Sequence, residues 1–134
     1  MAISNLQETL LMYTKYKSRI NRRVQEIQMD ILSATKQTYT EQQTFNEKQQ
    51  EYFYYYNRDG MEDYAEEYNA LCAELENELE LRLYNIKSWE EQLTSDKLNY
   101  EVLLQEIDQN ENTARQRLSK NIQSDFKYGG TSSS

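Results

Sequence analysis

The chain has 134 residues and a formal net charge of −8, with no histidine, no proline, one cysteine and only three glycines. So few turn-forming residues exclude the many chain reversals of a barrel, a sandwich or a doubly wound sheet, and they predict long helices. The missing histidine removes the commonest metal ligand and the usual acid–base group, and Cys72 has no second cysteine to pair with. We therefore predict no enzyme activity, no metal and no cofactor.

The acidic charge bears on the choice of partner, because nucleic acids and anionic membranes would repel it. We expect a protein partner, self-association into a homo-oligomer, or both, and no binding of nucleic acid. Apolar runs such as residues 10–13 are far below the roughly 18 to 20 residues that cross a bilayer. The first residues lack the basic start and apolar stretch of a signal peptide. These features predict a cytoplasmic protein without a membrane span, and export without a leader stays open.

The first part of the chain carries apolar residues at alternating steps of three and four, the spacing of a helix with one apolar seam. Ser4 followed by Gln7 has the pattern of a capping box, in which two side chains bond the first free N–H groups of a helix. We therefore predict a helix over about residues 4–56. Its seam comprises Ile3, Leu6, Leu10, Tyr13, Ile20, Val24, Ile27, Ile31, Ala34, Phe45, Tyr52 and Tyr55.

Residues 57–60, with the sequence Asn-Arg-Asp-Gly, form the predicted turn, because turn residues cluster nowhere else inside the chain. Asp59 is expected to cap a second helix over about residues 61–127. The two glycines that follow are expected to end that helix and to leave a disordered tail over 129–134. The second seam comprises Met61, Tyr64, Tyr68, Leu71, Leu75, Leu79, Leu83, Ile86, Trp89, Leu93, Tyr100, Leu104, Ile107, Ala114, Leu118 and Ile122.

Two long amphipathic helices joined by a short turn predict one all-α domain over residues 1–128, an antiparallel coiled-coil-like hairpin. Two alternatives stay open. One is a continuous helix in a parallel dimer, because a single glycine costs only about 1 kcal/mol inside a helix. The other is a three-helix chain with a break near residue 95.

The charges favour the hairpin, since residues 1–58 carry a net charge of +2 and residues 59–134 carry −10. Folding the chain at the predicted turn makes the numbers of facing residues sum to about 117. This register sets the basic residues 15–23 opposite the acidic residues 90–101. Exposed ion pairs each contribute only about 0 to 1 kcal/mol, so the apolar seams supply most of the expected stability.

Five consecutive aromatic residues precede the predicted turn. Neighbouring residues on a helix point in different directions, so these rings cannot all face the second helix and some must be exposed. Tyrosine is enriched at binding hot spots, which predicts a surface for a protein partner. The alternative is that the rings only seal the end of the hairpin. The predicted partner-binding residues here are Tyr52, Phe53, Tyr54, Tyr55 and Tyr56.

The predicted register also leaves part of the second helix without an intramolecular partner. The first helix would end opposite about residue 114, so residues 115–126 would overhang. Leu118, Ile122 and Phe126 keep helical spacing there among basic residues, which predicts a contact element for another protein or another copy. A frayed end with helical bias is the alternative.

Several apolar residues lie beside the seams, and a two-helix layer has no true interior, so we expect self-association into a four-helix arrangement. The alternative is that these are scattered surface residues. The alternating glutamates of residues 74–80 point around the helix and predict a solvated face rather than a metal site. The residues beside the seams are Leu11, Met12, Met29, Leu32, Leu81 and Leu103.

Together these features predict a non-enzymatic coiled-coil protein that acts as a structural or protein-interaction element of an oligomer or larger assembly. The alternative is a small accessory factor of a secretion or export machine: a stalk, a chaperone or an exported hairpin without a leader. The export stalk proteins share the layout of two long helices, although no sequence motif accompanies that likeness.

Overall fold

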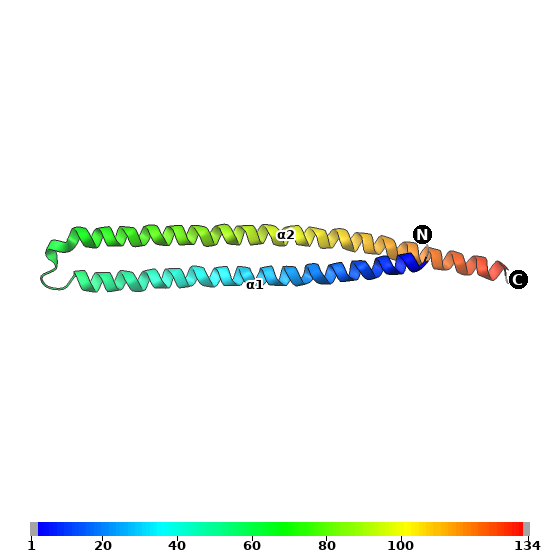
Figure 1. The fold of residues 1–134 in the computed structure, drawn as a ribbon, viewed down its shortest axis with the longest axis horizontal. Coiled ribbons are helices and arrows are strands. Elements are labelled where there is room, and N and C mark those ends of the chain that lie inside the picture. The colour runs from blue at the N-terminus through cyan, green and yellow to red at the C-terminus, as the bar shows by residue number, and fades with distance from the viewer. Residues whose placement is uncertain (1–2, 133–134) are drawn as a thin grey trace. The chain divides into compact units, whose positions relative to one another are not determined.

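The computed structural model describes residues 3–132, with side chains described for residues 3–126, and it consists of helices. Helix α1 spans Ile3–Tyr56, the short 3-10 helix η1 spans Glu62–Tyr64, and helix α2 spans Ala65–Ser132. The two long helices pack against each other as an all-α helical hairpin, which confirms the predicted fold class (Figure 1). The chain reverses after Tyr56 instead of continuing as one helix, and α2 runs through residue 95 without a break.

The hairpin comprises two compact units, each containing a stretch of both helices. The first unit combines Met1–Ile27 with Asp96–Ser134, and the second unit is Gln28–Ser95, which includes the turn. The core of each unit consists of residues from the two predicted seams. The buried apolar residues are Leu6, Ile20, Ile27, Ile107 and Ala114 in the first unit, and Ala34, Leu75 and Leu93 in the second.

The apolar residues beside the seams are all exposed. Met29 has 70% of its surface accessible, Leu32 62% and Leu81 61%, and the other three members of that set are exposed as well. Most seam residues are buried or half-buried, because the seam positions face the other helix and the neighbouring positions face outward. Four predicted seam residues are exposed instead: Tyr55, Tyr64, Trp89 and Ile122.

The ends of the two helices differ from the predicted ends. Helix α1 begins at Ile3, so Ser4 lies inside the helix and not at its cap. Helix α2 reaches Ser132, so the two glycines at 129 and 130 lie inside it instead of ending it. The physical reason is that glycine weakens a helix by only about 1 kcal/mol and does not by itself stop it. Residues 133 and 134 of the predicted tail lie outside the described residues.

The register in both units differs from the predicted sum of 117. In the second unit Glu41 pairs with Arg82, a sum of 123, and in the first unit Lys17 pairs with Asp108, a sum of 125. The connection between the helices covers residues 57–64, since η1 adds a further turn after the predicted one. This longer connection moves each facing residue of α2 toward the C-terminus. With these sums, residues 15–23 lie opposite about residues 100–110, so the predicted opposition to 90–101 is wrong for most of the basic run. The end of the run does meet the predicted range, since Arg23 forms a side-chain hydrogen bond with Tyr100.

The turn itself depends on Gly60, whose φ of +85° lies in the left-handed region that side chains disfavour. The backbone N–H of Met61 donates to the carbonyl of Arg58 at 3.2 Å, and the N–H of Tyr64 donates to the carbonyl of Met61 at 3.1 Å. No side-chain hydrogen bond caps η1, which follows Met61, so the predicted capping role of Asp59 is wrong.

Replacing Gly60 by Ala is expected to lower the free energy of unfolding by about 1 kcal/mol. A Cβ at this position meets no atom within 4 Å, so the cost comes from the backbone conformation alone. Gly60→Asn is the matched control, because asparagine tolerates this conformation better and should lose less stability. Urea unfolding followed by circular dichroism measures both. An alanine variant as stable as the parent would show that the turn does not need a positive φ.

Candidate functional site

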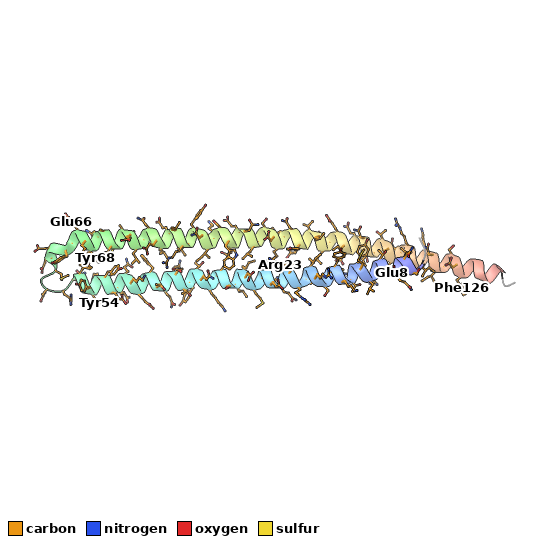
Figure 2. All side chains as sticks on the ribbon, viewed as in Figure 1. Glu8, Arg23, Tyr54, Glu66, Tyr68 and Phe126 are labelled. Carbon is orange, nitrogen blue, oxygen red and sulfur yellow. The ribbon has the colours of Figure 1, made fainter. Side chains whose placement is uncertain are left out.

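The turn end of the second unit carries a cluster of aromatic side chains, which we call the aromatic end: Tyr52, Phe53, Tyr54, Tyr55, Tyr56 and Tyr68. Tyr54 on α1 and Tyr68 on α2 are labelled in Figure 2. The exposed fractions are 71% for Tyr54, 51% for Phe53 and 50% for Tyr55, whereas Tyr52 and Tyr56 are half-buried. The structure thus divides the five predicted residues into an exposed group of three and an inner pair.

The inner rings join the two helices of the second unit. The ring of Tyr56 lies 5.6 Å from that of Tyr68 on α2 and 4.9 Å from that of Tyr55, measured between centroids. The Arg58 guanidinium stacks over the Tyr55 ring at 4.3 Å, a cation–π contact. Tyr56 thus packs across the end of the hairpin, while Tyr54 and its neighbours remain accessible.

The local backbone explains why these rings stay at the end of α1. Asn57, the residue after α1, donates its backbone N–H to the carbonyl of Phe53 at 3.1 Å and its side-chain Nδ2 to the same oxygen at 2.7 Å. The Nε of Arg58 donates to the carbonyl of Tyr55 at 3.2 Å. These bonds satisfy carbonyls that the end of a helix leaves free, and they hold Arg58 against the aromatic rings.

The electrostatic surroundings of the aromatic end are acidic. Partial burial raises the pKa of Tyr56, and the hydrogen bond with Glu67 raises it further. Partial burial, followed by a hydrogen bond with Cys72, raises the pKa of Tyr68. Both phenols therefore keep their protons at neutral pH. Exposed carboxylates begin η1 at Glu62 and Asp63 and α2 at Glu66 and Glu67, and Glu67 forms the hydrogen bond with Tyr56.

The three predicted contact residues near the C-terminus do not share one environment. Leu118 is half-buried, whereas Ile122 is 48% exposed and Phe126 is 81% exposed. The seam of α2 explains the difference, because its steps of three and four pass through Leu118 and Asn121, both half-buried, and leave Ile122 outside it. Helix α2 does extend past the start of α1, as predicted (Figure 1). The burial of Leu118 and Asn121 shows that this overhang begins later than residue 115.

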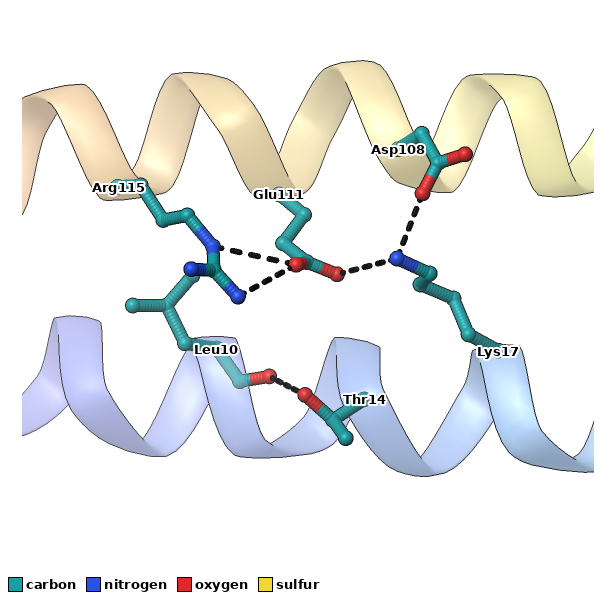
Figure 3. A network of polar contacts seen from close by, with 6 residues as sticks. All are labelled: Leu10, Thr14, Lys17, Asp108, Glu111 and Arg115. Carbon is teal, nitrogen blue, oxygen red and sulfur yellow. Dashed lines mark hydrogen bonds and ion pairs between the residues drawn. The ribbon is translucent and has the colours of Figure 1, made fainter.

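A polar cluster that the sequence did not lead us to expect joins α1 to α2 in the first unit (Figure 3). Lys17 Nζ lies 2.7 Å from Asp108 Oδ1 and 3.2 Å from Glu111 Oε2. The second contact is an ion pair whose angle does not make a hydrogen bond. Arg115 donates from Nη2 and Nε to Glu111 Oε1, at 2.8 and 3.1 Å. One carboxylate thus lies between two cations.

Glu111 is only 7% exposed, and the described side chains include no other charged one that is buried. The contact with Lys17 lowers its pKa most, burial acts in the opposite direction, and the bonds from Arg115 lower it further. Asp108 and then Glu111 raise the pKa of Lys17. The cluster holds the two helices of the first unit in one register, since the buried carboxylate needs its cations.

The sequence does contain a signal for this cluster. The predicted seams advance by seven residues from Tyr13 to Ile20 and again from Ile107 to Ala114, so each leaves out the one seam position that lies in between. Lys17 and Glu111 occupy the skipped seam positions. A charged residue at a seam position must find an opposite charge on the other helix, which is the pairing that the structure shows.

The remaining predicted features are less distinctive. The glutamates of residues 74–80 are exposed, and Cys72 is half-buried. Within residues 3–126, we find no group of three or more His, Cys, Asp and Glu side chains placed to hold a metal ion. No helix in the described part of the chain has an apolar stretch long enough to span a membrane.

Comparison with known proteins gives no family for this chain. Protein-family models, curated proteins and solved structures all lack a significant match to it.

Proposed function

We propose that this protein is a non-enzymatic interaction protein, a coiled-coil hairpin whose aromatic end binds a protein partner. The observation that carries the proposal is the exposure of Phe53, Tyr54 and Tyr55 next to one another at the end of the second unit. Such rings combine a large apolar surface with few rotatable bonds, so they lose little entropy when a partner covers them. Cytoplasmic residence stays a prediction from the sequence.

The burial pattern of the first unit supports the coiled-coil part of this proposal. Along α2 from residue 97 to residue 121, every position at alternating steps of three and four is buried or half-buried. The same holds along α1 from Ile3 to Ile27. This seven-residue period is the pattern by which two helices interlock their side chains.

The arrangement of the inner rings supports a binding surface rather than a loose patch. Tyr56 and Tyr68 are packed against each other across the two helices, so the exposed rings rest on an ordered base. Preorganised aromatic side chains bind with less entropic cost than mobile ones. The carboxylate of Glu67, which forms a hydrogen bond with Tyr56, would favour a partner with basic residues at its contact surface.

The test replaces two exposed rings and leaves the inner pair intact. Tyr54→Ser with Tyr55→Ser is expected to weaken partner binding at least about tenfold, because aromatic hot spots contribute about 2 kcal/mol or more. The matched control is Tyr16→Ser with Tyr84→Ser, two exposed tyrosines away from the aromatic end. Affinity capture from the source organism compares parent, variant and control. A partner that the parent and control retain and the variant loses supports the proposal.

If the parent and the variant with Tyr54→Ser and Tyr55→Ser capture the same amount of the partner, the aromatic end does not bind it. Circular dichroism must show the same helical content in all three chains, so that a loss of binding is not a loss of fold. The substituted side chains are exposed, and we expect changes in unfolding free energy within about 0.5 kcal/mol.

A further inference from the structure

A second face of α1 in the second unit is free of charged residues. It starts at Gln28 and continues to Tyr56 in alternating steps of four and three residues. We call it the uncharged row: Gln28, Leu32, Thr35, Tyr39, Gln42, Asn46, Gln49, Phe53 and Tyr56. The charged residues of the same stretch all lie off this row: Asp30, Lys36, Glu41, Glu47, Lys48 and Glu51.

The uncharged row is distinct from the seam that packs on α2. In this stretch the seam runs from Ile31 through Ala34 to Tyr52, and its residues are buried or half-buried. Every row residue except Tyr56 is exposed, including Leu32 at 62% and Tyr39 at 61%. Alternating steps of three and four are the spacing by which one helix contacts another. Helix α1 thus carries two faces with helix-contact spacing, and α2 covers the first.

The absence of charged residues from the uncharged row indicates which kind of partner could pack on it. The whole chain carries a net charge of −8, so its overall field repels another copy of the same chain. In a twofold contact the same surface patch occurs on both sides, so a patch with a net charge meets a patch of the same sign. A row without charges avoids this repulsion along its whole length. A partner recognised through opposite charge would instead select a charged face.

The chemistry of the row also complements itself. Its polar members are amides and a hydroxyl, which carry both donors and acceptors, so two equivalent rows can bond to each other. Its large apolar members, Leu32, Tyr39 and Phe53, are separated by multiples of seven residues and so fall on one line. At about 1.5 Å per residue the row extends on the order of 40 Å, long enough for two helices to pack side by side.

We propose that the uncharged row is the surface on which a second copy of this chain packs, row against row. The contact would cover Leu32 and Tyr39, which the fold of one chain leaves exposed. The row shares Phe53 and Tyr56 with the aromatic end, but Tyr54 and Tyr55, which the test of partner binding replaces, lie outside the row.

The test places two carboxylates in the row. The row variant is Thr35→Glu with Gln42→Glu, and the matched control is Gln37→Glu with Thr40→Glu. The two chains have identical composition and charge, and all four positions are exposed on α1 in the second unit. Sedimentation velocity from about 1 to 100 μM measures self-association, a range that brackets the affinity of weak to moderate dimers.

The parent and the control are expected to form dimers or larger assemblies with similar affinity. The row variant is expected to associate at least about tenfold more weakly, because a twofold contact doubles each added charge. Three results would overturn the proposal: a monomeric parent over this range, equal association of all three chains, or equal weakening in both variants. None of these results touches the aromatic end, which Tyr54→Ser and Tyr55→Ser test separately.

Discussion

Replacing Ile27 by Ala is expected to lower the free energy of unfolding by about 2 to 4 kcal/mol. Ile27 belongs to the first unit and is fully buried, with 0% of its surface exposed. Truncation removes apolar contacts and leaves a cavity that two regular helices cannot easily close. Urea unfolding followed by circular dichroism, with parent and variant at equal concentration, gives the difference.

The control is Met29→Ala, two residues further along the same helix. Met29 is 70% exposed, so its truncation is expected to change the free energy of unfolding by less than about 0.5 kcal/mol. Similar losses for the two variants would show that the face of α1 assigned to the core is wrong. The comparison matters because a two-helix layer depends on few fully buried side chains.

Replacing Glu111 by Gln is expected to lower the free energy of unfolding by about 1 to 2 kcal/mol at neutral pH. The variant keeps the shape of the side chain and removes the charge that holds Lys17 and Arg115. Because the pKa of Glu111 is lowered from its ordinary value of 4.5, the folded state favours the carboxylate. Its contribution is therefore fully present above pH 4.5 and is lost as the pH falls through the lowered pKa.

The difference between parent and Glu111→Gln should accordingly shrink in acid. Urea unfolding at a series of pH values below and above 4.5 measures it. Glu106→Gln is the matched control on α2, because Glu106 is exposed and its replacement should cost less than about 0.5 kcal/mol. A difference that stays constant or grows in acid would contradict the assigned role of the carboxylate.

The sequence was informative about which residues are buried and uninformative about which residues face each other. All the buried apolar residues of the described chain fall on the predicted seams, because the three–four spacing follows directly from helix geometry. The register depends instead on the conformation of residues 57–64. The sequence Asn-Arg-Asp-Gly predicts a turn, but it does not predict the 3-10 helix at Glu62–Tyr64 that lengthens the connection.

At the candidate site, too, the sequence predicts exposure but does not predict which residues face each other. Exposure of some rings in the run from Tyr52 to Tyr56 follows from helix periodicity alone. Which rings are exposed depends on Tyr68, whose position opposite Tyr56 follows from the register. The pairing of Lys17 with Glu111 was missed for the same reason, since net charges of the two halves attract in any register and select none.

The single buried carboxylate has a consequence for how the two helices of the first unit can slide along each other. A seam made only of apolar residues fits nearly as well after a slip of seven residues, because its pattern repeats with that period. Such a slip would bring Leu10 or Val24 to the place of Lys17. Glu111 would keep Arg115 of its own helix but lose the cation that α1 supplies to its second oxygen. A buried carboxylate that loses one of its cations is destabilised, so a slip costs more here than in an apolar seam. The ion pair between the helices thus supports the register that the connection at residues 57–64 sets.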